Sequence, residues 1–240
     1  MALALTGCVP QATGGGDLLQ QALGVGWPPT TATAARPMTT ADIAGGLKEA
    51  LRVGTERVVL QVGRTDGYNA DPAIHIPLPD DLRQVHDVLS RIGLGQMTAD
   101  LELRLNRAAE RAAPEARDVF WRAIAEMTLD DVHGIWRGPD DAATQYFRGK
   151  MTGPLTRRMT PIVLDAMSEV GVVRAFDRMM DGYRDVPFVP DVKADLTAYA
   201  VERALDGMFH YIAQEEAAIR RNPAKRTTEL LQRVFGALTS

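Results

Sequence analysis

The 240-residue chain contains a single cysteine, few aromatic residues and no long apolar run. One cysteine cannot form an internal disulfide, so an apolar core must hold the fold together. The apolar runs fall far short of the roughly 18 residues needed to span a bilayer. The formal net charge of −4 creates no basic field, so we do not expect nucleic acid as a partner.

Motifs that carry well-understood chemistry are also missing. The chain contains no Gly-x-Ser-x-Gly turn, no Gly-rich phosphate loop, no His-Glu-x-x-His helix and no Asp-x-Asp-x-Asp-Gly calcium loop. Asp130, Asp131 and His133 are metal-ligand types, but they match no ligand spacing. The sequence therefore predicts neither a metal site nor a cofactor, and it favours a protein that is not an enzyme.

What is present begins with the one cysteine. Leu5-Thr6-Gly7-Cys8 resembles the signal box of bacterial lipoproteins, in which the cysteine is lipidated. We interpret residues 1–8 as a truncated signal segment ending at the lipidation site Cys8, and residues 9–38, rich in Gly, Pro, Thr and Ala, as a flexible tether. This predicts a lipid-anchored protein on the periplasmic side of the cell envelope, with the membrane as a partner through Cys8.

The beginning of the chain departs from that pattern. Only seven residues precede Cys8, and none of them is basic, whereas a signal peptide has a basic start and a longer apolar run. If Met1 is the true start, the alternative is a cytoplasmic protein whose free cysteine lies in a tail.

Residues 39–240 have helical periodicity almost throughout and predict one all-α domain. Short connections favour an irregular antiparallel helical bundle. Two segments bounded by proline, Asn69–Pro79 and Val186–Pro190, predict extended straps on its surface. Thr39 is expected to cap the first helix, and Thr128 with Asp131 resembles a capping box.

Three further expectations concern the later helices. Pro114 suits the first position of a new helix. A helix is expected from Ala142 to about Lys150, and the longest helix from about Asp195 to Arg221. Glu216 and Arg220 are spaced as an i,i+4 pair and suggest a charged helix surface.

The first candidate site lies on the helix expected after Asp140. There Asp141, Thr144 or Gln145, and Arg148 share one face, while Tyr146 and Phe147 can point toward the core. Arg148 could bind a carboxylate or phosphate in a polar pocket. The alternative is that Asp141 caps the helix and Arg148 is solvated or ion-paired.

A second polar cluster contains Asn106 and Arg107. Arg107 could pair with Glu110 on a solvated face, whereas a buried Asn106 would need hydrogen bonds and would set helix register or line a pocket. Asp66 lies in a Thr-Asp-Gly turn, where its side chain can bond its own backbone. These residues are ligand-binding candidates beside those around Arg148.

Several blocks together carry a family resemblance. They are Gly46–Leu51, Arg64–Tyr68, Ile76–Pro79, Leu105–Glu110, Asp141–Arg148 and Ala204–Phe209. In order and spacing the chain is similar to the bacterial domain-of-unknown-function 4197 family over about residues 40–237. The resemblance implies an exported or lipid-anchored envelope protein and implies no activity.

These observations leave three functions open. The first is a non-enzymatic envelope lipoprotein, a binding or structural module for an envelope protein or small ligand. The second is a hydrolase-like envelope enzyme that uses Asp140 or Asp141 with Arg148. The third is a carrier of an apolar ligand in a cavity between helices.

Overall fold

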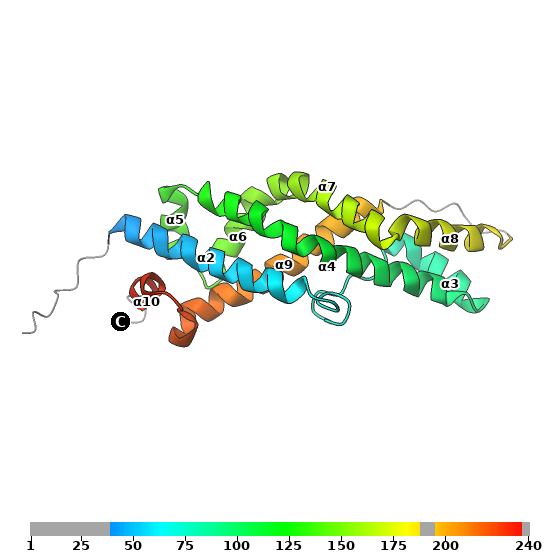
Figure 1. The fold of residues 1–240 in the computed structure, drawn as a ribbon, viewed down its shortest axis with the longest axis horizontal. Coiled ribbons are helices and arrows are strands. Elements are labelled where there is room, and N and C mark those ends of the chain that lie inside the picture. Colours follow the sequence, from blue (N-terminus) through cyan, green and yellow to red (C-terminus); the bar gives the residue numbers. More distant parts are fainter. Residues whose placement is uncertain (1–38, 188–194, 237–240) are drawn as a thin grey trace, which may run out of the picture. The chain divides into compact units, whose positions relative to one another are not determined.

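The structure is a computed structural model that describes residues 39–187 and 195–236. Within these ranges the chain forms helices and turns and contains no strand, which confirms the predicted all-α class. The helices are α2 (Thr40–Val62), α3 (Arg83–Arg91), α4 (Gly95–Ala125), α5 (Leu129–Trp136), α6 (Ala142–Tyr146), α7 (Thr152–Val170), α8 (Val172–Arg184), α9 (Leu196–Arg221) and α10 (Glu229–Gly236) (Figure 1). Cys8, the tether and residues 188–190 of the second strap lie outside the described residues.

The four long helices α2, α4, α7 and α9 form the bundle, and successive ones run in opposite directions (Figure 1). Helix α4 packs against α2, α7, α8 and α9. Its buried positions include Leu101 and Leu105 and a series of alanines, namely Ala108, Ala109, Ala112, Ala113, Ala116 and Ala123. Small side chains let several helices approach α4 closely, and this explains its position at the centre of the core.

Pro114 does not begin a helix, so that prediction is wrong. It lies inside the continuous helix α4. A proline there removes one backbone hydrogen bond and normally kinks or ends a helix. Around it Ala112, Ala113 and Ala116 are at most 2% exposed. Burial on both sides of the proline offsets the lost hydrogen bond.

The helix starts predicted at Thr39, Thr128 and Asp195 agree with the structure. The prediction that the helix from Asp195 is the longest is wrong, since α4 has 31 residues and α9 has 26. Thr39 and Asp42 form a reciprocal capping box at α2, and Thr128 and Asp131 form another at α5. Asp195 caps α9 by accepting a hydrogen bond from the Ala198 N–H. In each case the cap satisfies backbone N–H groups that the first turn leaves without a partner.

The helix expected from Ala142 to about Lys150 is divided. Helix α6 ends at Tyr146, and the wider π-helical turn Phe147–Met151 leads directly into α7. Such turns change the direction in which later side chains point. Arg148 lies in this turn, so the regular helical face expected to join it to Asp141 does not form.

Candidate functional site

Asp66 and Arg107 come together, although they are 41 residues apart. The Asp66 carboxylate accepts hydrogen bonds from the Asn69 amide at 2.9 Å and from the Arg107 guanidinium at 2.8 Å. Arg107 also donates to Glu110 at 2.6 Å, the i,i+3 pair that the sequence allowed. The pKa of Asp66 is lowered, chiefly by the Asn69 and Arg107 hydrogen bonds. Asp66 and Arg107 are therefore engaged with neighbouring side chains of the protein itself.

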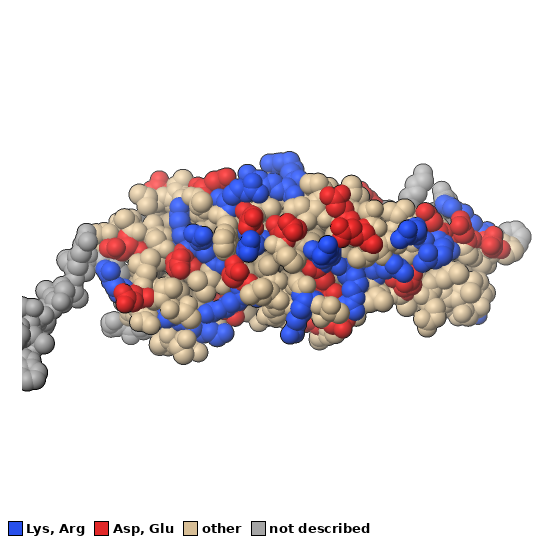
Figure 2. Space-filling model, viewed as in Figure 1, with Lys and Arg blue, Asp and Glu red and all other residues tan. Residues whose placement is uncertain are grey.

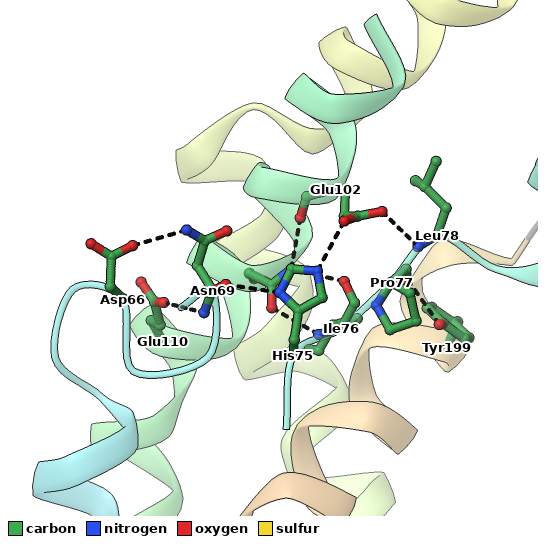
Figure 3. Close-up of polar contacts among 10 residues, drawn as sticks. Asp66, Asn69, His75, Ile76, Pro77, Leu78, Glu102, Glu110 and Tyr199 are labelled. Carbon is green, nitrogen blue, oxygen red and sulfur yellow. Dashed lines mark hydrogen bonds and ion pairs between the residues drawn. The ribbon is translucent and has the colours of Figure 1, made fainter. Parts of the chain in front are cut away.

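Glu110 holds the turn at the start of the first strap, whose residues 69–74 form mainly turns and not the extended chain predicted from Asn69. Glu110 is 4% exposed, and one carboxylate oxygen accepts the backbone N–H of Tyr68 at 3.1 Å. The same oxygen accepts the backbone N–H of Asn69 at 3.0 Å (Figure 3). The Tyr68 ring is fully buried, and its hydroxyl donates to the Ala204 carbonyl on α9 at 2.7 Å. Burial raises the pKa of the Tyr68 phenol. The turn is thus fastened to both α4 and α9.

Asn106 fastens the strap itself. Its side chain accepts from the Ile76 N–H at 2.9 Å and donates to the Ile76 carbonyl at 2.8 Å. One turn earlier on α4, Glu102 accepts the Leu78 N–H at 3.2 Å and lies 2.9 Å from His75 Nε2 (Figure 3). Both backbone groups of the buried Ile76 are therefore satisfied, as burial requires.

We call Glu102, Asn106 and Glu110 the strap clamp. They are four residues apart and therefore lie on one face of α4. The sequence indicated polar groups here, but it missed the role of Glu102. Because the strap backbone occupies these groups, the clamp is structural and offers few free polar groups to a ligand.

The residues proposed around Arg148 separate. Asp141 accepts a hydrogen bond from the Gln145 side chain at 2.8 Å. Arg148 forms an ion pair with Asp206 at 3.0 Å. Asp140 forms an ion pair with Arg221. The expected pocket that joins Asp140 or Asp141 to Arg148 is not formed, since each side chain has a different partner.

Thr144 and Tyr146 point elsewhere again. The Thr144 hydroxyl donates to Glu216 at 3.0 Å, and the Tyr146 hydroxyl donates to Asp131 at 2.8 Å. Burial and this hydrogen bond raise the pKa of Tyr146 to about 12. The pKa of Asp131 is lowered, first by the hydrogen bond from Lys150 and next by those from Thr128. Thr144 thus joins α6 to α9, and Tyr146 joins α6 to α5.

Glu216 and Arg220 form the expected i,i+4 pair at 3.0 Å, but the expectation of a charged surface is wrong. Their side chains are 4% and 5% exposed. Glu216 also accepts the backbone N–H groups of Ala143 and Thr144, and Arg220 donates to the Ile135 carbonyl. Burial raises the pKa of Glu216, and these donors oppose that shift. The pair is covered because α6 packs on α9.

One open groove contains Arg148. It lies between α7 and α9 and has a cavity volume of about 680 Å³. Its walls are Arg148, Thr152, Thr156, Thr160, Asp195, Thr197, Ala198, Glu202, Leu205, Asp206 and Phe209. This volume is within the range of small-molecule sites. We call it the α7–α9 groove.

The α7–α9 groove combines an apolar floor with oxygen acceptors. Leu205 and Phe209 are at most 3% exposed, and the Arg148 guanidinium lies 5.2 Å from the centre of the Phe209 ring. Glu202 is exposed and makes no ion pair within the described ranges. The sequence pointed to Arg148 alone. The wall formed by α7 could have been recognised in the sequence from Thr152, Thr156 and Thr160, which recur at every fourth position.

Two other cavities bear on the function. A second open cavity, lined by Met167, Val172, Val173, Phe176 and Leu196, shares Asp195 and Thr197 with the α7–α9 groove and has a volume of about 520 Å³. An enclosed apolar cavity beside Leu47, Ile212 and Phe235 has only about 10 Å³. That space cannot hold an apolar ligand, because even one water needs about as much.

The described part of the chain contains neither a group of metal ligands nor a membrane-spanning helix. Among residues 39–187 and 195–236, no three His, Cys, Asp or Glu residues lie close enough together to hold a metal ion. No helix in the same part of the chain combines the length and hydropathy needed to cross a bilayer. Figure 2 shows acidic and basic side chains interspersed over the face it draws, without a large patch of one sign.

The family model for proteins of unknown function designated DUF4197 matches residues 37–236 of the chain. Neither the curated proteins nor the solved structures contain a significant match. The match covers the whole helical bundle, including the strap clamp and the α7–α9 groove. This chain therefore belongs to the DUF4197 family.

Proposed function

We propose that this protein is a non-enzymatic binding module of the cell envelope, anchored by lipid on Cys8, whose binding site is the α7–α9 groove. The observation that carries the binding role is the groove itself. It is open, has a volume of about 680 Å³ and presents polar groups above an apolar floor. The polar groups of the strap clamp, by contrast, are occupied by backbone partners.

Support for the anchor comes from the sequence. Cys8 follows a leucine and two small residues, and the thirty residues after it are poor in charge. One acyl chain binds a membrane weakly, whereas two or more hold a protein there stably. Lipidation at Cys8 would leave the helical bundle free to meet ligands or partners next to the membrane.

The positions of the acidic groups favour binding over hydrolysis. General acid–base chemistry requires its groups within hydrogen-bond reach of one reacting centre. Asp140 is paired with Arg221, and Asp141 is bonded to Gln145, so neither converges with Arg148. The Arg148 guanidinium is itself paired with Asp206.

The test of the binding site blocks the groove in the full chain. Ala198 is exposed on α9 and lines the groove, so Ala198→Trp fills it without entering the core. Ala99→Trp, at an exposed position on α4, is the matched control. We expect envelope material or a small ligand to be recovered with the native chain and with Ala99→Trp, and lost with Ala198→Trp. Equal recovery by all three would overturn the assignment of the site.

The anchor has a separate test. Cells that express the native chain or Cys8→Ser are labelled with a palmitate analogue and fractionated. We expect label and membrane association only for the native chain. A native chain that takes up no label would remove the lipoprotein part of the proposal and leave the groove assignment standing.

A further inference from the structure

We infer that the α7–α9 groove binds a linear aliphatic diamine or polyamine, an inference that rests on the proposed binding role of this groove. Two of the four threonine hydroxyls in its walls have their protons committed to backbone carbonyls. The Thr152 hydroxyl donates to the Arg148 carbonyl at 2.6 Å, and the Thr160 hydroxyl donates to the Thr156 carbonyl at 2.8 Å. A hydroxyl has one proton, so both side chains can offer a ligand only lone pairs.

The α9 wall adds carboxylates. Asp195, Glu202 and Asp206 line the groove, and Arg148 is the one cationic side chain that the described part of the chain places in its walls, so these walls carry a formal charge of −2. Asp195 accepts the Ala198 N–H, and Asp206 accepts one Arg148 N–H, so each retains lone pairs. The Glu202 side chain has no hydrogen-bond or ion-pair partner among residues 39–187 and 195–236. This balance disfavours the carboxylate or phosphate ligand first considered for Arg148 and favours a donor-rich dication.

The spacing of the acids selects a linear ligand. Glu202 and Asp206 are one helical turn apart, so their Cβ atoms are about 5–6 Å apart. Asp195 lies seven residues before Glu202, about 10 Å along the helix axis. A chain of four methylenes places two ammonium nitrogens about 6 Å apart. A diamine can thus reach Glu202 and Asp206 together, and a longer polyamine can extend toward Asp195.

The floor of the groove suits the methylene chain between the charges. Leu205 and Phe209 lie beneath the acceptors and present apolar surface. The Arg148 guanidinium lies over the Phe209 ring at 5.2 Å and occupies that ring face, so the ammonium groups of a ligand would pair with the carboxylates of α9. A ligand with ammonium ends and an aliphatic middle would meet both kinds of wall.

The experiment is calorimetric titration of the purified full chain with diaminobutane, spermidine and butylamine at low and moderate salt. We expect diaminobutane and spermidine to bind and butylamine to bind at least about tenfold more weakly, since it can make only one charge-assisted contact. Equal affinity for diaminobutane and butylamine, or no detectable binding of either amine, would overturn the inference.

The key variant is Glu202→Gln, which keeps the side-chain shape and removes the free carboxylate. We expect it to weaken diaminobutane binding by about tenfold or more. Glu49→Gln on α2 is the matched control, because Glu49 has no ion pair in the described structure and does not line the groove. If both variants bind like the native chain, the amines respond to net charge alone and the site is wrong.

A third arm identifies the source of the ammonium groups. If a tetralysine peptide binds more tightly than spermidine, with the same dependence on Glu202, the polyamine inference is overturned and the ligand is a basic peptide segment. If no amine binds but Ala198→Trp still abolishes the recovery of envelope material, the inferred ligand class is wrong and the proposed binding function of the groove stands.

Discussion

Asn106 pairs with both backbone groups of Ile76, as a neighbouring strand would. Its amide oxygen accepts the Ile76 N–H at 2.9 Å, and its amide nitrogen donates to the Ile76 carbonyl at 2.8 Å. The pairing lets an irregular segment lie against the central helix with its backbone satisfied. Pro77 and Pro79 beside Ile76 have no N–H to satisfy, which lowers the number of partners that the strap requires.

Replacing Asn106 by Leu should destabilise the protein strongly. The side-chain volume is similar, but the buried Ile76 N–H and carbonyl lose their partners, at a cost of about 2–4 kcal/mol in the free energy of unfolding. Urea denaturation followed by circular dichroism measures the change. Gln96→Leu, at an exposed position on the same helix, is the control and should have little effect. A loss below about 1 kcal/mol for Asn106→Leu would mean that the strap bonds contribute little.

Two glycine substitutions should act in opposite directions. A Cβ atom on Gly207 would lie 2.6 Å from the Tyr68 ring and 3.2 Å from Ile74 Cβ, so Gly207→Ala should cost about 1–3 kcal/mol of stability. A Cβ on Gly134 in α5 meets nothing within 4 Å. Gly134→Ala should therefore gain roughly 0.5–1 kcal/mol through helix propensity alone. Thermal unfolding of both variants tests this, and a stabilised Gly207→Ala would contradict the tight packing of the strap turn on α9.

The buried pair should be far more sensitive than an exposed one. Arg220→Met leaves the Glu216 carboxylate buried without its cation and should cost about 3–5 kcal/mol. Glu216→Gln combined with Arg220→Met should recover part of this loss, which a double-mutant cycle measures. The exposed pair Arg83–Asp80 supplies the control, and Arg83→Met should change stability by no more than about 1 kcal/mol. Similar costs at the two sites would show that the burial of Glu216 and Arg220 is wrong.

The contribution of Asp131 should depend on pH. Its folded-state pKa is lowered from 3.8, so its stabilising effect is present above pH 3.8 and is lost as the pH falls below that value toward the folded pKa. At neutral pH, Asp131→Asn should cost about 1 kcal/mol. The difference from the native chain should shrink when denaturation is repeated below pH 3.8. Asp87→Asn, at an exposed position on α3, is the control. A difference that stays constant across this pH range would contradict the carboxylate's role.

The capping boxes were predictable because their information is local. Thr39 with Asp42 and Thr128 with Asp131 each lie within four residues, and the hydrogen bonds close inside one turn. Pro114 shows the limit of such local signals. Its ring favours a helix start, but the buried alanines of α4 on both sides of it keep the helix continuous.

Predicting the site was harder. The sequence indicated that Arg148 and Asn106 were worth attention, but their partners Asp206 and Ile76 are 58 and 30 residues away. Spacing within one helix cannot specify contacts of that range. For the same reason, the i,i+4 relation of Glu216 to Arg220 was visible in the sequence while their burial under α6 was not.

By itself, the sequence determined the helical class, most helix starts and the presence of a non-helical strap, since periodicity, capping and proline act over a few residues. Only the tertiary structure decided which polar side chains satisfy buried backbone and which remain free to bind. That division depends on how α7 and α9 pack and leave a groove, and packing brings together residues that are distant in the chain.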